Sequence, residues 1–159
     1  MERKPGIGVL GPAQADAQVL ALAEQVGAEI AGRGAVLICG GLGGVMEAAA
    51  RGAKRAGGLT VGITPGTDAR EANPFIDVPV VTGLGEARNV LVVRSSNAVI
   101  AIAGSYGTLS EIAFALKLGV PVIGLGTWEL RAPDGSEPPI IVGESAVEAV
   151  EKALKAIDT

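Results

Sequence analysis

Short apolar runs alternate along this chain with longer segments in which apolar residues recur every three or four positions. The runs are rich in β-branched residues and end at or beside glycine, which is typical of strands buried on both faces of a parallel sheet. The periodic segments predict amphipathic helices. We therefore expect strands at 6–11, 35–39, 59–63, 76–81, 99–103 and 120–125, and helices near 19–30, 45–56, 84–96, 108–119 and 144–157.

The alternation of strand and helix predicts an α/β fold, a doubly wound and mainly parallel sheet with helices on both faces. Pro79 favours an edge position for strand 76–81, because proline cannot donate to a sheet ladder. Residues 128–139 are rich in turn formers, and we expect a tight turn at Asp134-Gly135 between short antiparallel segments. The chain has 159 residues, and we interpret 1–159 as a single ligand-binding domain.

The composition excludes several classes of function. The chain has no histidine, which rules out a Ser-His-Asp triad and His-ligated metal sites. We interpret its one cysteine, Cys39, as a small core residue. The net charge of −4 and the scattered Lys and Arg argue against a nucleic acid polymer as partner. No run has the length of a membrane span or the pattern of a signal peptide, so we expect a cytoplasmic protein that makes no membrane contact.

Two glycine-rich loops follow predicted strands, at 40–44 and at 104–107. A glycine loop between a strand end and a helix start exposes backbone N–H groups beside the positive end of a helix dipole, which favours a phosphate or a carboxylate. Neither loop is a P-loop, and 40–44 does not have the dinucleotide-binding spacing. Glycines at such turns can also serve packing alone, and this alternative stays open for 40–44.

Several side chains around the second loop carry candidate chemistry. Thr108 is predicted to cap the following helix with Glu111 as its capping-box partner. Alternatively, Glu111 is a carboxylate that acts on the sugar of a ligand. Arg88 lies on the helix before strand 99–103 and can reach a phosphate, although a solvated surface role is the alternative. Tyr106 either stacks on a ligand ring or is simply exposed.

The two loops carry a resemblance to a known group of proteins. The run GGLGGVM at 40–46 and the run AGSYGTLSE at 103–111 resemble the two signature loops of the LOG-like (SLOG) Rossmann superfamily. That group includes the cytokinin riboside 5′-monophosphate phosphoribohydrolases, once labelled lysine decarboxylases, whose second signature begins with Pro-Gly-Gly. The resemblance implies that Gly104, Gly107 and Thr108 hold phosphate, and that Arg88 and Glu111 match the catalytic pair of the hydrolases.

This chain departs from the hydrolase signature at informative positions. Ala103 stands in place of the signature proline, Ser105 in place of the second glycine, and Asn89 in place of the lysine that usually follows the arginine. These departures argue against a hydrolase activity.

A nearer resemblance covers almost the whole chain. The runs GVLGP at 8–12, GAKRAGG at 52–58, PVVTGLGEAR at 79–88 and SSN at 95–97 are similar to the molybdenum cofactor carrier protein branch of the same superfamily. This resemblance implies a Rossmann-like fold, a pterin ligand that carries a phosphate, and a homo-oligomer, either a homodimer or a homotetramer.

We therefore expect a protein that binds a phosphorylated, nucleotide-like small molecule and needs no cofactor to fold. The candidate ligands are the molybdenum cofactor and a nucleoside monophosphate. One alternative is an enzyme that hydrolyses the N-glycosidic bond of a nucleoside 5′-monophosphate with Arg88 and Glu111 as catalytic residues, and a second is a non-catalytic scaffold with a vestigial cleft. The predicted ligand-binding residues are Gly11, Gly40, Gly41, Leu42, Gly43, Arg88, Gly104, Ser105, Tyr106, Gly107 and Thr108.

Overall fold

The computed structural model describes residues 1–158, which form one seven-stranded sheet. The strand order is β4-β3-β2-β1-β5-β6-β7, and every neighbouring pair is parallel. The expected doubly wound α/β class is therefore confirmed. The strands are β1 (Gly6–Leu10), β2 (Val36–Cys39), β3 (Thr60–Thr64), β4 (Val78–Val81), β5 (Ala98–Ile102), β6 (Val122–Leu125) and β7 (Ile140–Val142).

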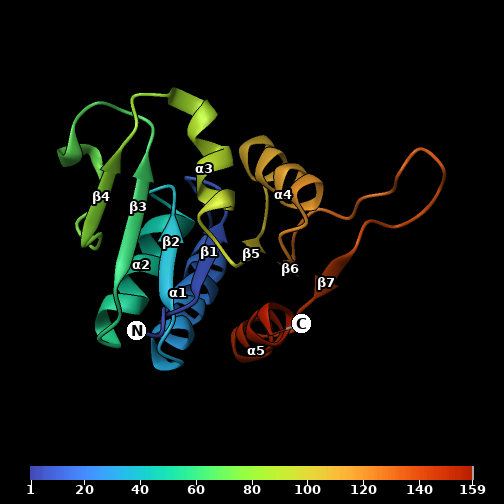
Figure 1. The fold of residues 1–159 in the computed structure, drawn as a ribbon, viewed down its shortest axis with the longest axis horizontal. Coiled ribbons are helices and arrows are strands. Elements are labelled where there is room, and N and C mark those ends of the chain that lie inside the picture. Colours follow the sequence, from blue (N-terminus) through green and yellow to red (C-terminus); the bar gives the residue numbers. More distant parts are fainter. Residues whose placement is uncertain (159) are drawn as a thin grey trace.

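Helices cover both faces of the sheet (Figure 1). Along β5, Ile100 and Ile102 pack into one buried core while Val99 and Ala101 pack into the other, as the alternation of side chains along a strand requires. None of the described helices is long and apolar enough to cross a membrane. One face carries α1 (Ala17–Gly32), α2 (Val45–Arg55) and α5 (Ala146–Ile157), and the other carries α3 (Asn89–Arg94) and α4 (Tyr106–Leu118).

Helices α1 and α2 approach each other closely because glycine lies at their crossing. A Cβ atom at Gly52 of α2 would overlap the backbone carbonyl of Glu24 in α1, and one at Gly27 of α1 would overlap the carbonyl of Ala49 in α2. The two backbones therefore touch directly. This close packing explains how a chain with few large side chains builds a dense core on this face.

The two edges of the sheet match the predictions from the sequence only in part. Strand β4, which contains Pro79, lies at one edge as expected. A tight turn brings the amide of Gly135 to 2.9 Å from the carbonyl of Ala132. The antiparallel segments expected around that turn are absent from the described residues, because β7 pairs in parallel with β6. In Figure 1 the connection between these two strands extends away from the body of the molecule.

The helix expected at 84–96 is shorter and less regular than predicted. Its first part is the 3-10 helix η2 (Gly85–Arg88), and only Asn89–Arg94 is α-helical. The segment between β3 and β4 also contains a short 3-10 helix, η1 (Ala69–Glu71), capped by Asp68. Both pieces border the carboxyl edge of the sheet, where the candidate site lies.

Candidate functional site

A cleft of about 320 Å³ lies at the carboxyl edge of the sheet, near the point where the strand order reverses between β1 and β5. Ligands of open α/β sheets bind at such switch points. The cleft brings together residues from the segments that follow β1, β2, β3, β4 and β5. Its lining consists of Gly11, Ala13, Leu42, Met46, Pro65, Gly85, Glu86, Arg88, Asn89, Ser105, Gly107, Thr108 and Glu111.

The first turn of α4 forms one wall of the cleft, and its cap differs from the prediction. Ser105, not Thr108, is the N-cap: its hydroxyl accepts from the amide of Thr108 at 3.4 Å. The Thr108 hydroxyl accepts from the amide of Ser105 at 3.2 Å, so these two residues form the capping box and Glu111 takes no part in it. Within residues 1–158, the amides of Tyr106 and Gly107 have no hydrogen-bond partner. They are free to bind an anion.

Arg88 also lines the cleft and is only 9% exposed. Its Nη2 donates to the carbonyl of Gly40 at 3.3 Å, and its Nη1 donates to Oδ1 of Asn89. Its Nε has no partner among the described residues. Burial lowers the pKa of the guanidinium, and the nearby charge of Glu111 opposes that shift. A buried guanidinium with an unused N–H is costly unless an anion satisfies it.

Glu111 lies in the second turn of α4 and is 8% exposed. Burial raises the pKa of its carboxyl from 4.5 to about 7, although the positive charge of Arg88 acts in the opposite direction. The carboxyl is thus divided between its protonated and ionised forms near neutral pH. A group of this kind can accept or donate a proton in the cleft.

Most of the glycine loop at 40–44 lies outside the lining of the cleft. Only Leu42 of this loop lines the cleft, whereas Gly40, Gly41 and Gly43 do not. Gly40 lies behind Arg88, and a Cβ atom there would come within 2.7 Å of Nη2. Gly44 has a φ of 64° and abuts the backbone of Ala13, so its glycine is required by conformation and by space. Packing accounts for Gly40 and Gly44.

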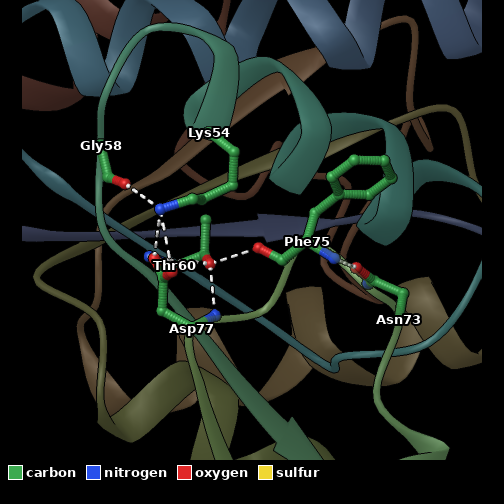
Figure 2. Close-up of polar contacts among 6 residues, drawn as sticks. All are labelled: Lys54, Gly58, Thr60, Asn73, Phe75 and Asp77. Atoms are coloured by element: carbon green, nitrogen blue, oxygen red, sulfur yellow. Dashed lines mark hydrogen bonds and ion pairs between the residues drawn. The ribbon is translucent and has the colours of Figure 1, made fainter.

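Asn73 holds this loop in place, and sequence reasoning missed it. Its backbone amide donates to the carbonyl of Gly41 at 2.8 Å, and its Nδ2 donates to the carbonyl of Leu42 at 2.9 Å. Its Oδ1 accepts from the amide of Phe75 at 3.0 Å (Figure 2). Asn73 is 9% exposed and belongs to the irregular stretch before β4. No periodic or motif signal marks it in the sequence.

A polar cluster anchors the segment that carries Asn73 (Figure 2). The hydroxyl of Thr60 donates to the carbonyl of Phe75 at 2.5 Å, and the carboxylate of Asp77 accepts from the amide of Thr60 at 3.0 Å. Lys54 of α2 lies 2.8 Å from Asp77 and donates to the carbonyl of Gly58. These contacts join the segment before β4 to the start of β3 and the end of α2. The segment that directly follows Asn73 is therefore fixed to the sheet and to α2.

The remaining predicted residues lie outside the lining of the cleft. The space beside Gly104 is filled by the indole of Trp128, which explains that glycine by packing. Tyr106 is 83% exposed. Cys39 is fully buried, and its sulfur accepts from the amide of Gly41 at 3.4 Å. Burial raises the pKa of the Cys39 thiol to about 12, so it stays protonated at neutral pH.

Within residues 1–158, no other hollow contains a buried side-chain nitrogen or oxygen atom without a hydrogen-bond partner. The groove between α1 and α2 has a volume of about 490 Å³, but its charged residues, Glu24 and Arg55, pair with each other. No group of three or more His, Cys, Asp or Glu side chains within the described part of the chain could hold a metal ion. The cleft between Arg88 and α4 is therefore the candidate site.

Comparison with known proteins places this chain in a family. Residues 4–153 match the model of the SLOG cluster4 family, and the chain belongs to that family. It is 45% identical, over 93% of its length and 91% of the relative, to an uncharacterised protein of Archaeoglobus fulgidus. It is 42% identical to a cytokinin riboside 5′-monophosphate phosphoribohydrolase of Mycobacterium tuberculosis, over 70% of this chain and 65% of the relative.

Solved structures agree with this assignment. The molybdenum cofactor binding protein of the phototrophic bacterium Rippkaea orientalis superposes with a TM-score of 0.88 at 41% identity, and all of both chains is covered. The Moco carrier protein of Chlamydomonas reinhardtii superposes with a TM-score of 0.85 at 37% identity, over 98% of this chain and 99% of that one. The resemblance to the LOG-like superfamily is thereby confirmed.

Proposed function

We propose that this chain binds a phosphorylated small molecule in the cleft, and that the molybdenum cofactor is that ligand. The observation that carries the proposal is the buried guanidinium of Arg88, whose Nε lacks a partner anywhere in residues 1–158. Gly107, whose amide is free, lines the same cleft. A phosphate group accepts hydrogen bonds from both kinds of donor and carries the charge that the guanidinium requires.

The similarity to a molybdenum cofactor binding protein and to a Moco carrier protein supports this ligand. The residues present fit the phosphate end of such a cargo, and binding alone requires no catalysis. On this proposal the whole chain acts as one phosphate-ligand-binding domain. A homodimer or homotetramer stays a prediction, which sedimentation velocity tests.

The test is an anaerobic calorimetric titration with molybdopterin, with Arg88→Met as the variant and Arg94→Met as the matched control. Arg94 lies on α3, close to Arg88 in the chain, but is exposed. A hydrogen bond to a charged group contributes about 1.5–3 kcal/mol, so Arg88→Met should weaken binding by about 10-fold or more and Arg94→Met by less than 2-fold. If the unmodified protein did not bind molybdopterin, the molybdenum cofactor would be refuted as the ligand. If the two variants bound molybdopterin with equal affinity, the cleft at Arg88 would be refuted as the binding site.

Glu111 favours a second candidate function. Its carboxyl, with a pKa of about 7, lies in the cleft with Arg88, and the chain is similar to a phosphoribohydrolase. In that reaction water adds to C1′ of the sugar, the N-glycosidic bond breaks, and its electron pair leaves with the base. Glu111 would take the proton from water or stabilise the positive charge at C1′ while Arg88 holds the phosphate.

Incubation with AMP and with isopentenyladenosine monophosphate separates the two functions. Release of free base that disappears in Glu111→Gln would establish the hydrolase and refute binding without catalysis. The departures at Ala103, Ser105 and Asn89 lead us to expect no release. If both Arg88→Ala and Thr108→Ala left every ligand measurement unchanged, the cleft would be vestigial.

A further inference from the structure

The chain's only tryptophan and only tyrosine lie together beside the cleft. Tyr106 is the first residue of α4, and Trp128 belongs to the connection between β6 and β7. Their ring centroids are 6.0 Å apart with an angle of 29° between the planes, which is a stacked arrangement. Tyr106 is 83% exposed, so most of its ring is open to solvent although Trp128 lies beside it.

Trp128 holds this pair at the first turn of α4. Its Nε1 donates to the carbonyl of Ser105 at 3.1 Å. Its indole lies against Gly104, where any Cβ atom would come within 2.5 Å of Nε1. Because Ser105 is the N-cap of α4 and lines the cleft, the aromatic pair is attached to the wall that carries the free amides.

Tyr106 lies between two residues of the cleft wall. Ser105 and Gly107, its neighbours in the chain, both line the cleft. Such a large exposed aromatic side chain gains little from folding, since most of its apolar surface stays in water. Its exposed ring beside Trp128 is instead suited to a planar ring that arrives with the phosphate.

We propose that the Tyr106–Trp128 pair is a stacking platform for the planar heteroaromatic ring of the ligand whose phosphate binds between Arg88 and α4. This inference rests on the proposed function and identifies the residues that bind the second half of the ligand. A nucleobase and a pterin share the chemistry that the platform recognises, which is a flat π-system without a required hydrogen-bond pattern. The platform therefore selects for ring-bearing phosphates over sugar phosphates.

Three probes test the platform: ribose 5-phosphate, which has no aromatic ring, AMP, and 6-hydroxymethylpterin phosphate. Binding is measured by calorimetry for the unmodified protein, Tyr106→Ala and Tyr106→Phe, and chromatography verifies that AMP stays intact. Stacking of one base on an aromatic side chain changes affinity by about 5- to 150-fold. We expect at least one ring-bearing probe to bind at least 5-fold more tightly than ribose 5-phosphate, and the better probe identifies a nucleobase or a pterin as the ring.

The variants separate the platform from the phosphate site. Tyr106→Ala should remove the advantage of the ring-bearing probe and change ribose 5-phosphate binding by less than 2-fold, while Tyr106→Phe should keep the advantage. Equal affinity for all three probes, or an equal loss for all three in Tyr106→Ala, would overturn the platform and leave the phosphate site intact. Binding of none of the probes would refute both. A change of sedimentation coefficient in Tyr106→Ala without a change in ring preference would assign the pair to contact with another protein chain.

Discussion

Replacement of Asn73 by alanine should loosen the glycine loop behind the cleft without damaging the rest of the sheet. The side chain of Asn73 donates to the carbonyl of Leu42 at 2.9 Å and accepts from the amide of Phe75 at 3.0 Å. The carbonyl of Gly41 keeps a donor in the variant, because it also binds the backbone amide of residue 73 at 2.8 Å. Two backbone groups therefore lose their partners.

The expected cost follows from those two groups. Each lost hydrogen bond at a partly exposed position costs about 1 kcal/mol, so Asn73→Ala should lower the free energy of unfolding by about 2 kcal/mol. For a chain of this length, a loss of that size lowers Tm by about 4–8 °C. The local effect should be larger than the global one. Since Leu42 lines the cleft, the loop that places it should open more often and ligand affinity should fall.

The matched control is Asn97→Ala. The Oδ1 of Asn97 accepts from the amide of Gly6 at 2.8 Å, at the opposite edge of the sheet. Both variants should melt earlier, but only Asn73→Ala should speed amide hydrogen exchange at 40–46 and weaken molybdopterin binding by at least 3-fold more than the control. If the two variants lost stability alike and neither changed exchange at 40–46, Asn73 would have no role in positioning the loop.

Two further predictions concern Glu111 and the helix crossing. Because burial raises the pKa of Glu111 from 4.5 to about 7, the folded protein keeps a proton that the unfolded chain releases between these values, so stability falls as pH rises through this window. Glu111→Gln should remove this dependence, so the Tm of the variant minus the Tm of the unmodified protein should increase from pH 5 to pH 8. A difference in Tm that stays constant with pH would contradict a raised pKa of Glu111. Gly52→Ala should cost more than about 3 kcal/mol, because its Cβ would overlap the carbonyl of Glu24, whereas Gly32→Ala, in open space, should leave the denaturation midpoint nearly unchanged or raise it. Similar midpoints for the two alanine variants would contradict the close crossing of α1 and α2.

The sheet could be predicted from the sequence because its strands are buried on both faces. The run at 98–102 contains only apolar residues and is completely covered, so its pattern and its environment agree. Strand β7 was not predicted, since it has three residues, lies at an edge and follows Pro138 and Pro139. Its neighbours are turn formers without alternation. Strand β7 forms because it pairs in parallel with β6, and the local sequence pattern does not indicate that pairing.

A site residue could be predicted from the sequence only where its neighbours in the chain indicate its position in the fold. Arg88 and Glu111 were selected because their elements flank β5, and the structure places both in the cleft. The prediction of Thr108 as the N-cap was wrong. Ser105 and Thr108 are both good capping residues, and the backbone conformation decides between them. Asn73 acts through carbonyl groups 31 and 32 positions away, so only the folded chain reveals it.

The conformation of Ala103 links the departures from the hydrolase signature to the shape of the site. Ala103 is the one non-glycine residue with a positive φ in the described part of the chain, at 54°. Its carbonyl accepts from the hydroxyl of Thr127 at 2.5 Å and its amide donates to Leu125 at 3.2 Å, which holds this strained turn. Proline, with φ fixed near about −65°, cannot adopt it. The proline that the hydrolase signature has at this position therefore requires a different entry into α4, and the replacement by alanine permits the positive-φ turn that precedes the cap at Ser105.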